Sequence, residues 1–304
     1  MQLMHCARLW VFVVWAGVGL LGCAGTLRPQ QPIQDARVAL ARREATIEGL
    51  HSIRAEARVD QRAKSGRIKG TVLMFVEDVG RVRFDVMTQF GPIAILTSDG
   101  EQFAFSDLRE KRYLFGQTCP ENIARLLGVP LSAEETARFL LGGTPLIAHT
   151  ESALVLNDAG HYQLTLKGQS GAKQELELAV YPGDEALAPE QQRLKLVRSE
   201  LWDADAKSVW RVGYADHEAI QLQGRQLHVP KRVHIEQPSQ GADTLVSFKS
   251  ITANPNIPAE AFTQSARPGM QEEEATCDEV EQPEAVEQPD PVAVEPEQPE
   301  QPIQ

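Results

Sequence analysis

The feature that most constrains this chain is a long succession of segments in which apolar and polar side chains alternate. In residues 53–60 four apolar side chains alternate with four charged ones, which is the two-residue period of a half-buried β-strand. Strands are predicted there and at residues 67–77, 81–87, 93–98, 102–105, 112–115, 154–156, 161–167, 174–181, 194–202, 209–216, 227–237 and 244–251. Short turns such as Asp99-Gly100 join many of them, so we expect a mainly β, antiparallel (α+β) fold.

A few helices interrupt the alternation. Residues 35–50 have helical spacing, with Asp35 at the N-cap. Two shorter helices are predicted between the sixth and seventh strands. The first begins with Thr118 and Glu121 at capping-box spacing and ends at Gly128, and the second begins with the same spacing at Ser132 and Glu135.

The N-terminus has the features of an export signal. Arg8 precedes an apolar run, Leu9–Leu21, which as a helix would span only about 20 Å of a ~30 Å bilayer core. The sequence Leu20-Leu21-Gly22-Cys23 resembles a bacterial lipobox, in which the Cys is acylated and becomes the mature N-terminus. This resemblance predicts a lipoprotein signal peptide at 1–22 and a lipidated tether at 23–34. The alternative is an ordinary cleaved signal with an incidental Cys.

Location follows from the residue after the lipobox. Ala24 stands there, whereas an Asp retains lipoproteins at the inner membrane of enteric bacteria. The resemblance therefore implies an outer-membrane lipoprotein of a Gram-negative bacterium, anchored by lipid and facing the periplasm.

The C-terminal segment 271–304 differs in composition from the rest of the chain. It holds twelve of the 42 acidic residues, many prolines and no Lys or Arg, whereas residues 23–270 are nearly neutral. Such a segment cannot bury enough apolar surface to order itself, so we predict a disordered acidic tail. It is either a spacer or a ligand for a basic partner. The neutral body has no basic stripe, which argues against a nucleic-acid partner.

After removal of the signal and acylation of Cys23, two cysteines remain. Cys119 and Cys277 could pair in an oxidising periplasm or stay as two free thiols.

No catalytic or metal-binding motif is present. HExxH, GxSxG, a phosphate-binding loop and CxxC are all missing from the sequence. His228 and His234 share a strand but are six residues apart, roughly 20 Å, which is too far for a shared metal ion. We therefore predict no enzyme, no metal and no cofactor.

Residues 82–142 resemble the middle of the LolB family of lipoprotein localisation factors. The likeness rests on a strand that enters a short loop at Phe90-Gly91, a hairpin at Asp99-Gly100, and paired helices. The helices contain Leu126-Leu127-Gly128-Val129-Pro130-Leu131 and Phe139-Leu140-Leu141-Gly142. It implies a strongly curved antiparallel sheet over residues 35–270, forming an open half-barrel with Leu126, Leu127, Phe139 and Leu140 in a helical lid.

In function, the resemblance implies a receptor for acylated lipoproteins. A periplasmic LolA-like carrier would deliver them, a hydrophobic cavity would take up their acyl chains, and outer-membrane lipid would accept them. The loop with Phe90 and Gly91 would enter the bilayer. On the residues alone, Phe90 could equally plug the end of the core.

Four apolar side chains are candidates for the cavity lining, because they occupy the parity opposite to the main apolar stripe. They are Leu73, Phe75, Leu96 and Leu201. An ordinary sandwich core would explain them equally well. Two functional alternatives stay open: a carrier of another lipid, and an envelope tether that works through the acidic tail. An enzyme acting on lipid or glycan is a weaker third reading.

Overall fold

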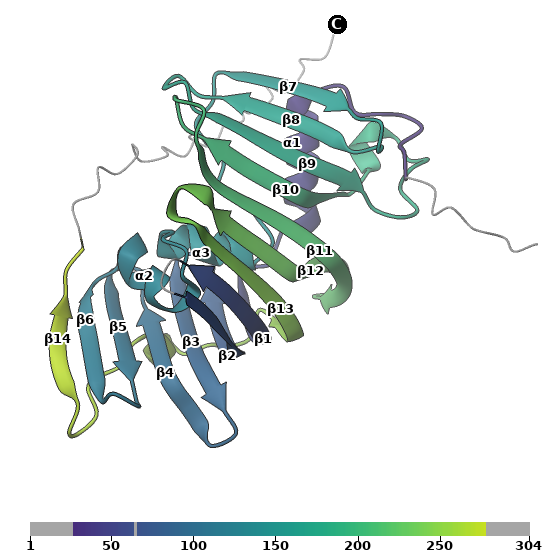
Figure 1. The fold of residues 1–304 in the computed structure, drawn as a ribbon. Coiled ribbons are helices and arrows are strands. Elements are labelled where there is room, and N and C mark those ends of the chain that lie inside the picture. Colours follow the sequence, from purple (N-terminus) through teal and green to yellow (C-terminus); the bar gives the residue numbers. More distant parts are fainter. Residues whose placement is uncertain (1–26, 64–65, 278–304) are drawn as a thin grey trace, which may run out of the picture.

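The computed structural model describes residues 27–63 and 66–277, and all of its strands join one sheet (Figure 1). Cys23, the predicted signal peptide and residues 278–304 lie outside the described residues. The strands are β1 Ser52–Ala63, β2 Gly66–Glu77, β3 Arg81–Thr88, β4 Gly91–Ser98, β5 Gln102–Asp107, β6 Arg112–Gln117, β7 Glu151–Leu156, β8 Tyr162–Lys167, β9 Lys173–Val180, β10 Leu194–Trp202, β11 Ser208–Leu222, β12 Arg225–Gln237, β13 Ala242–Ala253 and β14 Gln271–Ala275. The α-helices are α1 Ala36–Ile47, α2 Pro120–Leu127 and α3 Ala133–Leu140.

The sheet consists of two antiparallel meanders joined at the first strand. Strands β1 to β6 follow one another, β7 to β13 do the same, and β1 pairs with β13. The resulting order is β14-β6-β5-β4-β3-β2-β1-β13-β12-β11-β10-β9-β8-β7, so β14 and β7 are the two edges and the sheet is open. The sheet curves strongly (Figure 1). The predicted fold class, an open and curved antiparallel sheet with a few helices, is confirmed.

The main core lies on the sheet face that the helices cover. Cross-strand pairs place Ala55, Met74, Phe84 and Leu96 side by side on four neighbouring strands, and all four are buried. Small side chains on β1 leave room for the larger ones on β2 to β4. Apolar residues of α2 and α3 complete this core, so the helical side of the sheet is closed by protein.

The helices begin much as their capping residues predict. The Asp35 carboxylate accepts the backbone N–H of Arg37 at 2.7 Å, and Ser132 and Glu135 form the predicted capping box of α3. The capping box predicted at Thr118 is wrong: Cys119 is the N-cap of α2, and Thr118 hydrogen-bonds Ser98 at 2.8 Å. Of the described helices, none is long and apolar enough to cross a membrane.

The predicted boundary of the disordered tail is also wrong. Residues 271–275 form β14, which pairs in parallel with β6, and Arg112 binds Glu273 at 2.6 Å. Cys119 and Cys277 form a disulfide with a Cα–Cα distance of 6.1 Å. The free edge of β6, this ion pair and the disulfide supply partners that the composition of the segment alone does not reveal.

The tether was predicted to span residues 23–34, but its last residues are docked on the folded domain. The N–H of Gln30 donates to the carbonyl of Glu185 at 2.7 Å, and the N–H of Ile33 donates to the hydroxyl of Tyr162 at 2.9 Å. Ile33 is buried. The chain is therefore docked on the β7–β9 half of the sheet before α1 begins.

Candidate functional site

The hairpin between β3 and β4 presents an apolar side chain to solvent. Phe90 is 91% exposed. Its N–H donates to the Thr88 hydroxyl at 3.2 Å, and the same hydroxyl donates to the Gly91 carbonyl at 2.9 Å. Gly91 has a φ of 117°, a conformation that favours glycine. The turn is thus tied together by local bonds and holds Phe90 outward, so the alternative in which Phe90 plugs the core is wrong.

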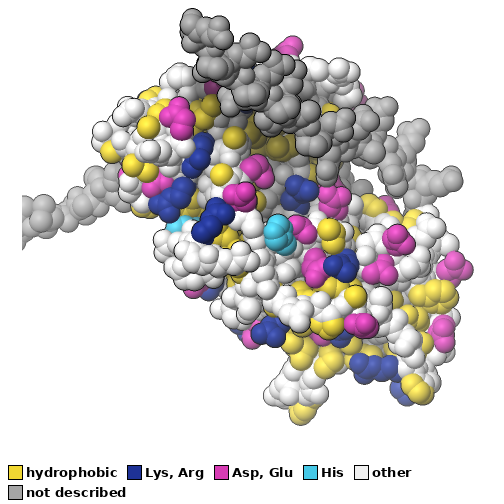
Figure 2. Space-filling view, turned by 180° about the vertical axis from the view of Figure 1, so that it is seen from behind, with side chains coloured by type: hydrophobic (Ala, Val, Ile, Leu, Met, Phe, Trp, Pro, Cys, Tyr) yellow, Lys and Arg dark blue, Asp and Glu magenta, His cyan; other side chains and the backbone are white. Residues whose placement is uncertain are grey.

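The same hairpin lacks charge. From Val86 to Ser98 the sequence contains no Asp, Glu, Lys or Arg. In the space-filling view the hairpin protrudes from the lower edge of the molecule and carries hydrophobic side chains at its tip (Figure 2). An uncharged projection ending in an exposed aromatic ring is suited to insertion into an apolar phase.

The predicted lid residues lie on the closed side of the sheet. Leu127, Phe139 and Leu140 are buried and Leu126 is partly buried. The Phe139 ring packs edge-on against Trp210, with ring centroids 5.0 Å apart. Side chains from the helices therefore fill the space beside this face of the sheet.

Polar contacts hold the segment after α3 against the sheet. The Tyr214 hydroxyl donates to the carbonyls of Gly143 and Phe139. Its burial raises its pKa, so it remains a protonated donor. Arg43 of α1 donates to the carbonyl of Gly142. These contacts define what must break if α3 moves.

The four predicted cavity residues do not share a face. Leu96 pairs with Phe84 and belongs to the main core, whereas Leu73 and Phe75 lie on the other face, opposite Asp85 and Arg83. For Leu96 the prediction of opposite parity is therefore wrong. The reason is that both faces of β4 are covered, so the parity of apolar residues does not distinguish them.

The second covering of β4 comes from the segment before β14. Phe262 is buried there, and the side-chain amide of Gln264 donates to the carbonyls of Ile95 and Ala104 at 3.0 and 2.9 Å.

Leu201 lies on the same face as the core residue Trp210, its partner on β11. A register shift in β10 between Leu196 and Arg198 reverses the parity on which the prediction relied. A bulge of this kind has no sequence signal here. The prediction that Leu201 opposes the main stripe is therefore wrong.

Metal chemistry has no support in the described part of the chain, where no group of three His, Cys, Asp or Glu side chains could hold an ion.

Comparison with known proteins gives structural likeness only. No family model and no curated protein matches the sequence. Among solved structures, a domain named as an outer membrane lipoprotein-sorting protein from Vibrio parahaemolyticus is 11% identical, with a TM-score of 0.48 over 75% of this chain and 95% of that one. A LolA superfamily protein from Nitrosomonas europaea is 11% identical, with a TM-score of 0.46 over 77% and 99%. A DUF1329 family protein from Desulfovibrio piger is 12% identical, with a TM-score of 0.47 over 76% and 96%. No conclusion about ligand or partner follows from these values.

Proposed function

We propose that this chain is a lipid-anchored, LolB-like receptor of the outer membrane, which takes acyl chains of lipoproteins beneath α2 and α3 and releases them to the bilayer. The observation that carries the proposal is the β3–β4 hairpin, whose uncharged tip holds Phe90 91% exposed. An aromatic ring kept in water by local hydrogen bonds has no stabilising role in the fold, so its place at the tip is better explained by contact with another apolar phase.

The energetics of the cargo require an apolar receiving surface. At ~0.8 kcal/mol per buried CH₂, three acyl chains of about fourteen methylenes each cost over ~30 kcal/mol to expose to water. The face of the sheet that carries Met74, Phe84 and Leu96 is apolar, and at present it contacts the side chains of α2 and α3. If the helices move aside, an acyl chain replaces Leu127 and Phe139 as the apolar neighbour of this face.

Residues 30–33, which follow the predicted anchor, and the β3–β4 hairpin lie on different halves of the sheet. The chain after Cys23 docks beside Tyr162 of β8, whereas Phe90 follows β3 in the other meander. With acylated Cys23 and Phe90 at one bilayer, the domain would lie along the membrane surface.

The experiment begins with the full chain carrying Cys23→Ser, which cannot be acylated at that position. Mass spectrometry identifies molecules that co-purify with it, and a second assay follows the passage of a radiolabelled lipoprotein from a carrier to this protein and then to liposomes. Bound lipoprotein and its onward transfer support the proposal. Bound free lipid without lipoprotein transfer identifies a carrier of another lipid. An empty protein that accepts nothing overturns the proposal and favours an envelope tether.

A further inference from the structure

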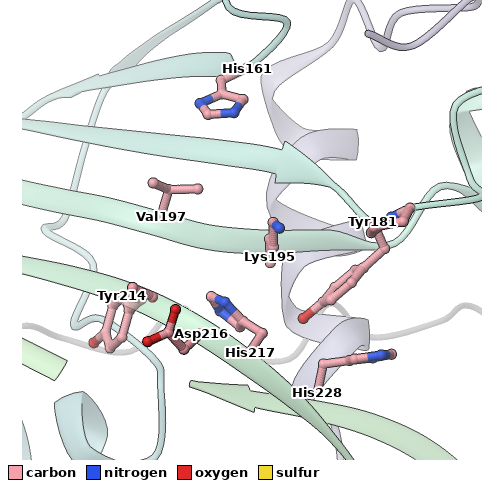
Figure 3. Close-up of a pocket in the computed structure, with 10 residues that line it drawn as sticks. His161, Tyr181, Lys195, Val197, Tyr214, Asp216, His217 and His228 are labelled. Carbon is pink, nitrogen blue, oxygen red and sulfur yellow. The ribbon is translucent and has the colours of Figure 1, made fainter. Parts of the chain in front are cut away.

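The sheet opens between β10 and β11. Within the described residues, the two strands pair only where residues 198–202 of β10 meet residues 208–213 of β11. The first part of β10 then pairs only with β9, and the second part of β11 only with β12. A cavity of about 480 Å³ occupies the opening, a volume in the range of small-molecule sites. Figure 3 shows the two strands diverging, with α1 passing behind the gap.

Aromatic and basic side chains line this cavity. Figure 3 shows Lys195 on β10, His217 on β11 and Tyr181 directly after β9 around the gap, with His228 on β12 below them. The ring of Tyr181 lies 4.4 Å from that of His228 and 6.3 Å from that of His217, measured between centroids. Lys195 Nζ is 5.8 Å from the centroid of the Tyr181 ring.

A buried guanidinium that does not line the cavity acts through its charge on groups that do. Arg43 of α1 is only 3% exposed. It donates one hydrogen bond, to the carbonyl of Gly142, while its Nε and Nη1 have no partner among the described residues. Burial disfavours the charge of Arg43 and lowers its pKa, but arginine stays protonated in proteins. A buried cation without a paired carboxylate is costly, so an anion bound near it is stabilised by its charge.

The charge of Arg43 acts on the groups of the cavity. It opposes the burial that raises the pKa of Tyr181 to about 12. Burial lowers the pKa of His217 to about 4, and the charges of Lys195 and Arg43 add to this effect. His217 is therefore neutral at pH 7, because it is partly buried beside positive charge.

Acidic groups near the cavity are already paired. Asp216, which lines it, binds Arg232 at 2.5 Å, and Asp184 near Tyr181 binds Arg193 at 2.8 Å. At the outer rim His161 contacts Glu177 at 2.6 Å. In the described part of the chain no carboxylate lies within salt-bridge distance of Lys195 or Arg43. Among the residues that line the cavity, Lys195 thus carries a positive charge that no carboxylate of the described residues pairs.

We propose that this cavity binds the phosphate group of a phosphate-bearing ligand. Lys195 lines the cavity with an ammonium group that no carboxylate of the described residues pairs, and the charge of Arg43 adds to the positive potential at Tyr181 and His217. This potential stabilises a doubly charged phosphate more than a singly charged carboxylate. The protonated hydroxyl of Tyr181 donates a further hydrogen bond. The rest of the ligand lies against Val197 and Pro182, at the apolar part of the lining. The inference does not depend on the acyl-chain function, because the cavity lies in the other half of the sheet from Phe90.

The test uses the unacylated full chain, Cys23→Ser, and titration calorimetry at low ionic strength. The probes are inorganic phosphate, dihexanoyl phosphatidylglycerol below its micelle concentration, and dihexanoyl glycerol, which lacks phosphate. The variant is Lys195→Gln, which changes a partly exposed side chain and leaves Arg43 in place. The matched control is Lys207→Gln, which removes the same charge from an exposed site in the β10–β11 turn. Circular dichroism verifies that both variants are folded.

We expect a phosphate-bearing probe to bind. Lys195→Gln should lower its affinity at least about tenfold, and Lys207→Gln should leave its affinity unchanged. Tyr181→Phe, which keeps the ring, should weaken binding less. Equal affinity for both phosphate probes identifies a soluble phosphate compound as the ligand, whereas binding of the phospholipid alone identifies a lipid headgroup. The proposal is overturned if neither probe binds at millimolar concentration, if dihexanoyl glycerol binds as well, or if the two lysine variants behave alike.

Discussion

Replacement of Phe90 separates a membrane-inserting tip from a structural residue. Because Phe90 is 91% exposed, Phe90→Ala removes almost no buried surface, and we expect the free energy of unfolding to change by less than ~0.5 kcal/mol. A Phe packed in a core would cost ~3–5 kcal/mol on the same substitution. Urea denaturation of the wild type and of Phe90→Ala measures this change in the free energy of unfolding directly.

Membrane binding should respond in the opposite way. Transfer of a Phe side chain from water to an apolar phase is worth about 2 kcal/mol, which corresponds to ~30-fold in a partition coefficient. Phe90→Ala should lower the binding of the unacylated chain to liposomes by about this factor. Phe90→Glu should lower it further, because a carboxylate resists entry into the bilayer, and should leave cargo bound on the receptor.

Val79 supplies a matched control. It is 65% exposed in the turn between β2 and β3, at the opposite end of β3 from Phe90. Val79→Glu should leave liposome binding and cargo transfer unchanged. Either a large destabilisation in Phe90→Ala or undiminished transfer by Phe90→Glu would refute insertion of the tip.

Three further predictions concern the anchor, the C-terminal segment and the partly buried imidazole of His217. A palmitate analogue should label the wild type, and equal labelling of Cys23→Ser would disprove the lipid anchor. A chain ending after Cys277 should keep its stability. A chain ending after Met270 loses β14 and the disulfide, and its free energy of unfolding should fall by about 2 to 4 kcal/mol without reductant. Equal denaturation midpoints for the two chains would show that residues 271–277 contribute nothing. The pKa of His217 is about 4 when folded, against ~6.5 unfolded, so its stabilising contribution is complete above pH 6.5 and declines as pH falls toward 4. Between pH 7 and pH 5 this amounts to about 2 kcal/mol, and His217→Gln should remove that part of the urea-midpoint shift.

The alternation of residues predicted the buried face of a strand correctly where the other face is exposed to solvent. In β1 the alternation of small apolar and charged residues marks the buried face directly, since Ala55 and Ala57 are buried while Arg54 and Arg58 are exposed. The same reasoning failed at Leu96, because segment 258–264 covers the second face of β4. Contacts between segments so far apart in the chain leave no periodic signal.

The tail and the cavity escaped prediction for related reasons. Residues 271–275 look disordered by composition, and only the edge of β6 and the disulfide from Cys119 order them. The cavity between β10 and β11 depends on where two strands stop pairing. Arg43, whose charge acts on Tyr181 and His217 in the lining, looks in the sequence like an ordinary exposed residue of an amphipathic helix. Arg43 stands four positions after Ala39 and three before Thr46, two small buried residues, which is a weak signal that this helix face turns inward.

Arg43 contacts the segment after α3 and acts by its charge on groups that line the cavity. One nitrogen of its guanidinium donates to the carbonyl of Gly142, directly after α3, while two others have no partner among the described residues. The planar group fixes the directions of its donors relative to one another, so a shift of Arg43 toward the cavity changes its bond to Gly142. Cys119, by contrast, ties the start of α2 covalently to Cys277. Of the two helices over the core, α3 is therefore held by hydrogen bonds that can be exchanged and α2 by a bond that cannot. Substitution of Arg43 would disturb the position of α3 and the charge of the cavity together, which is why Lys195 is the residue that tests the cavity alone.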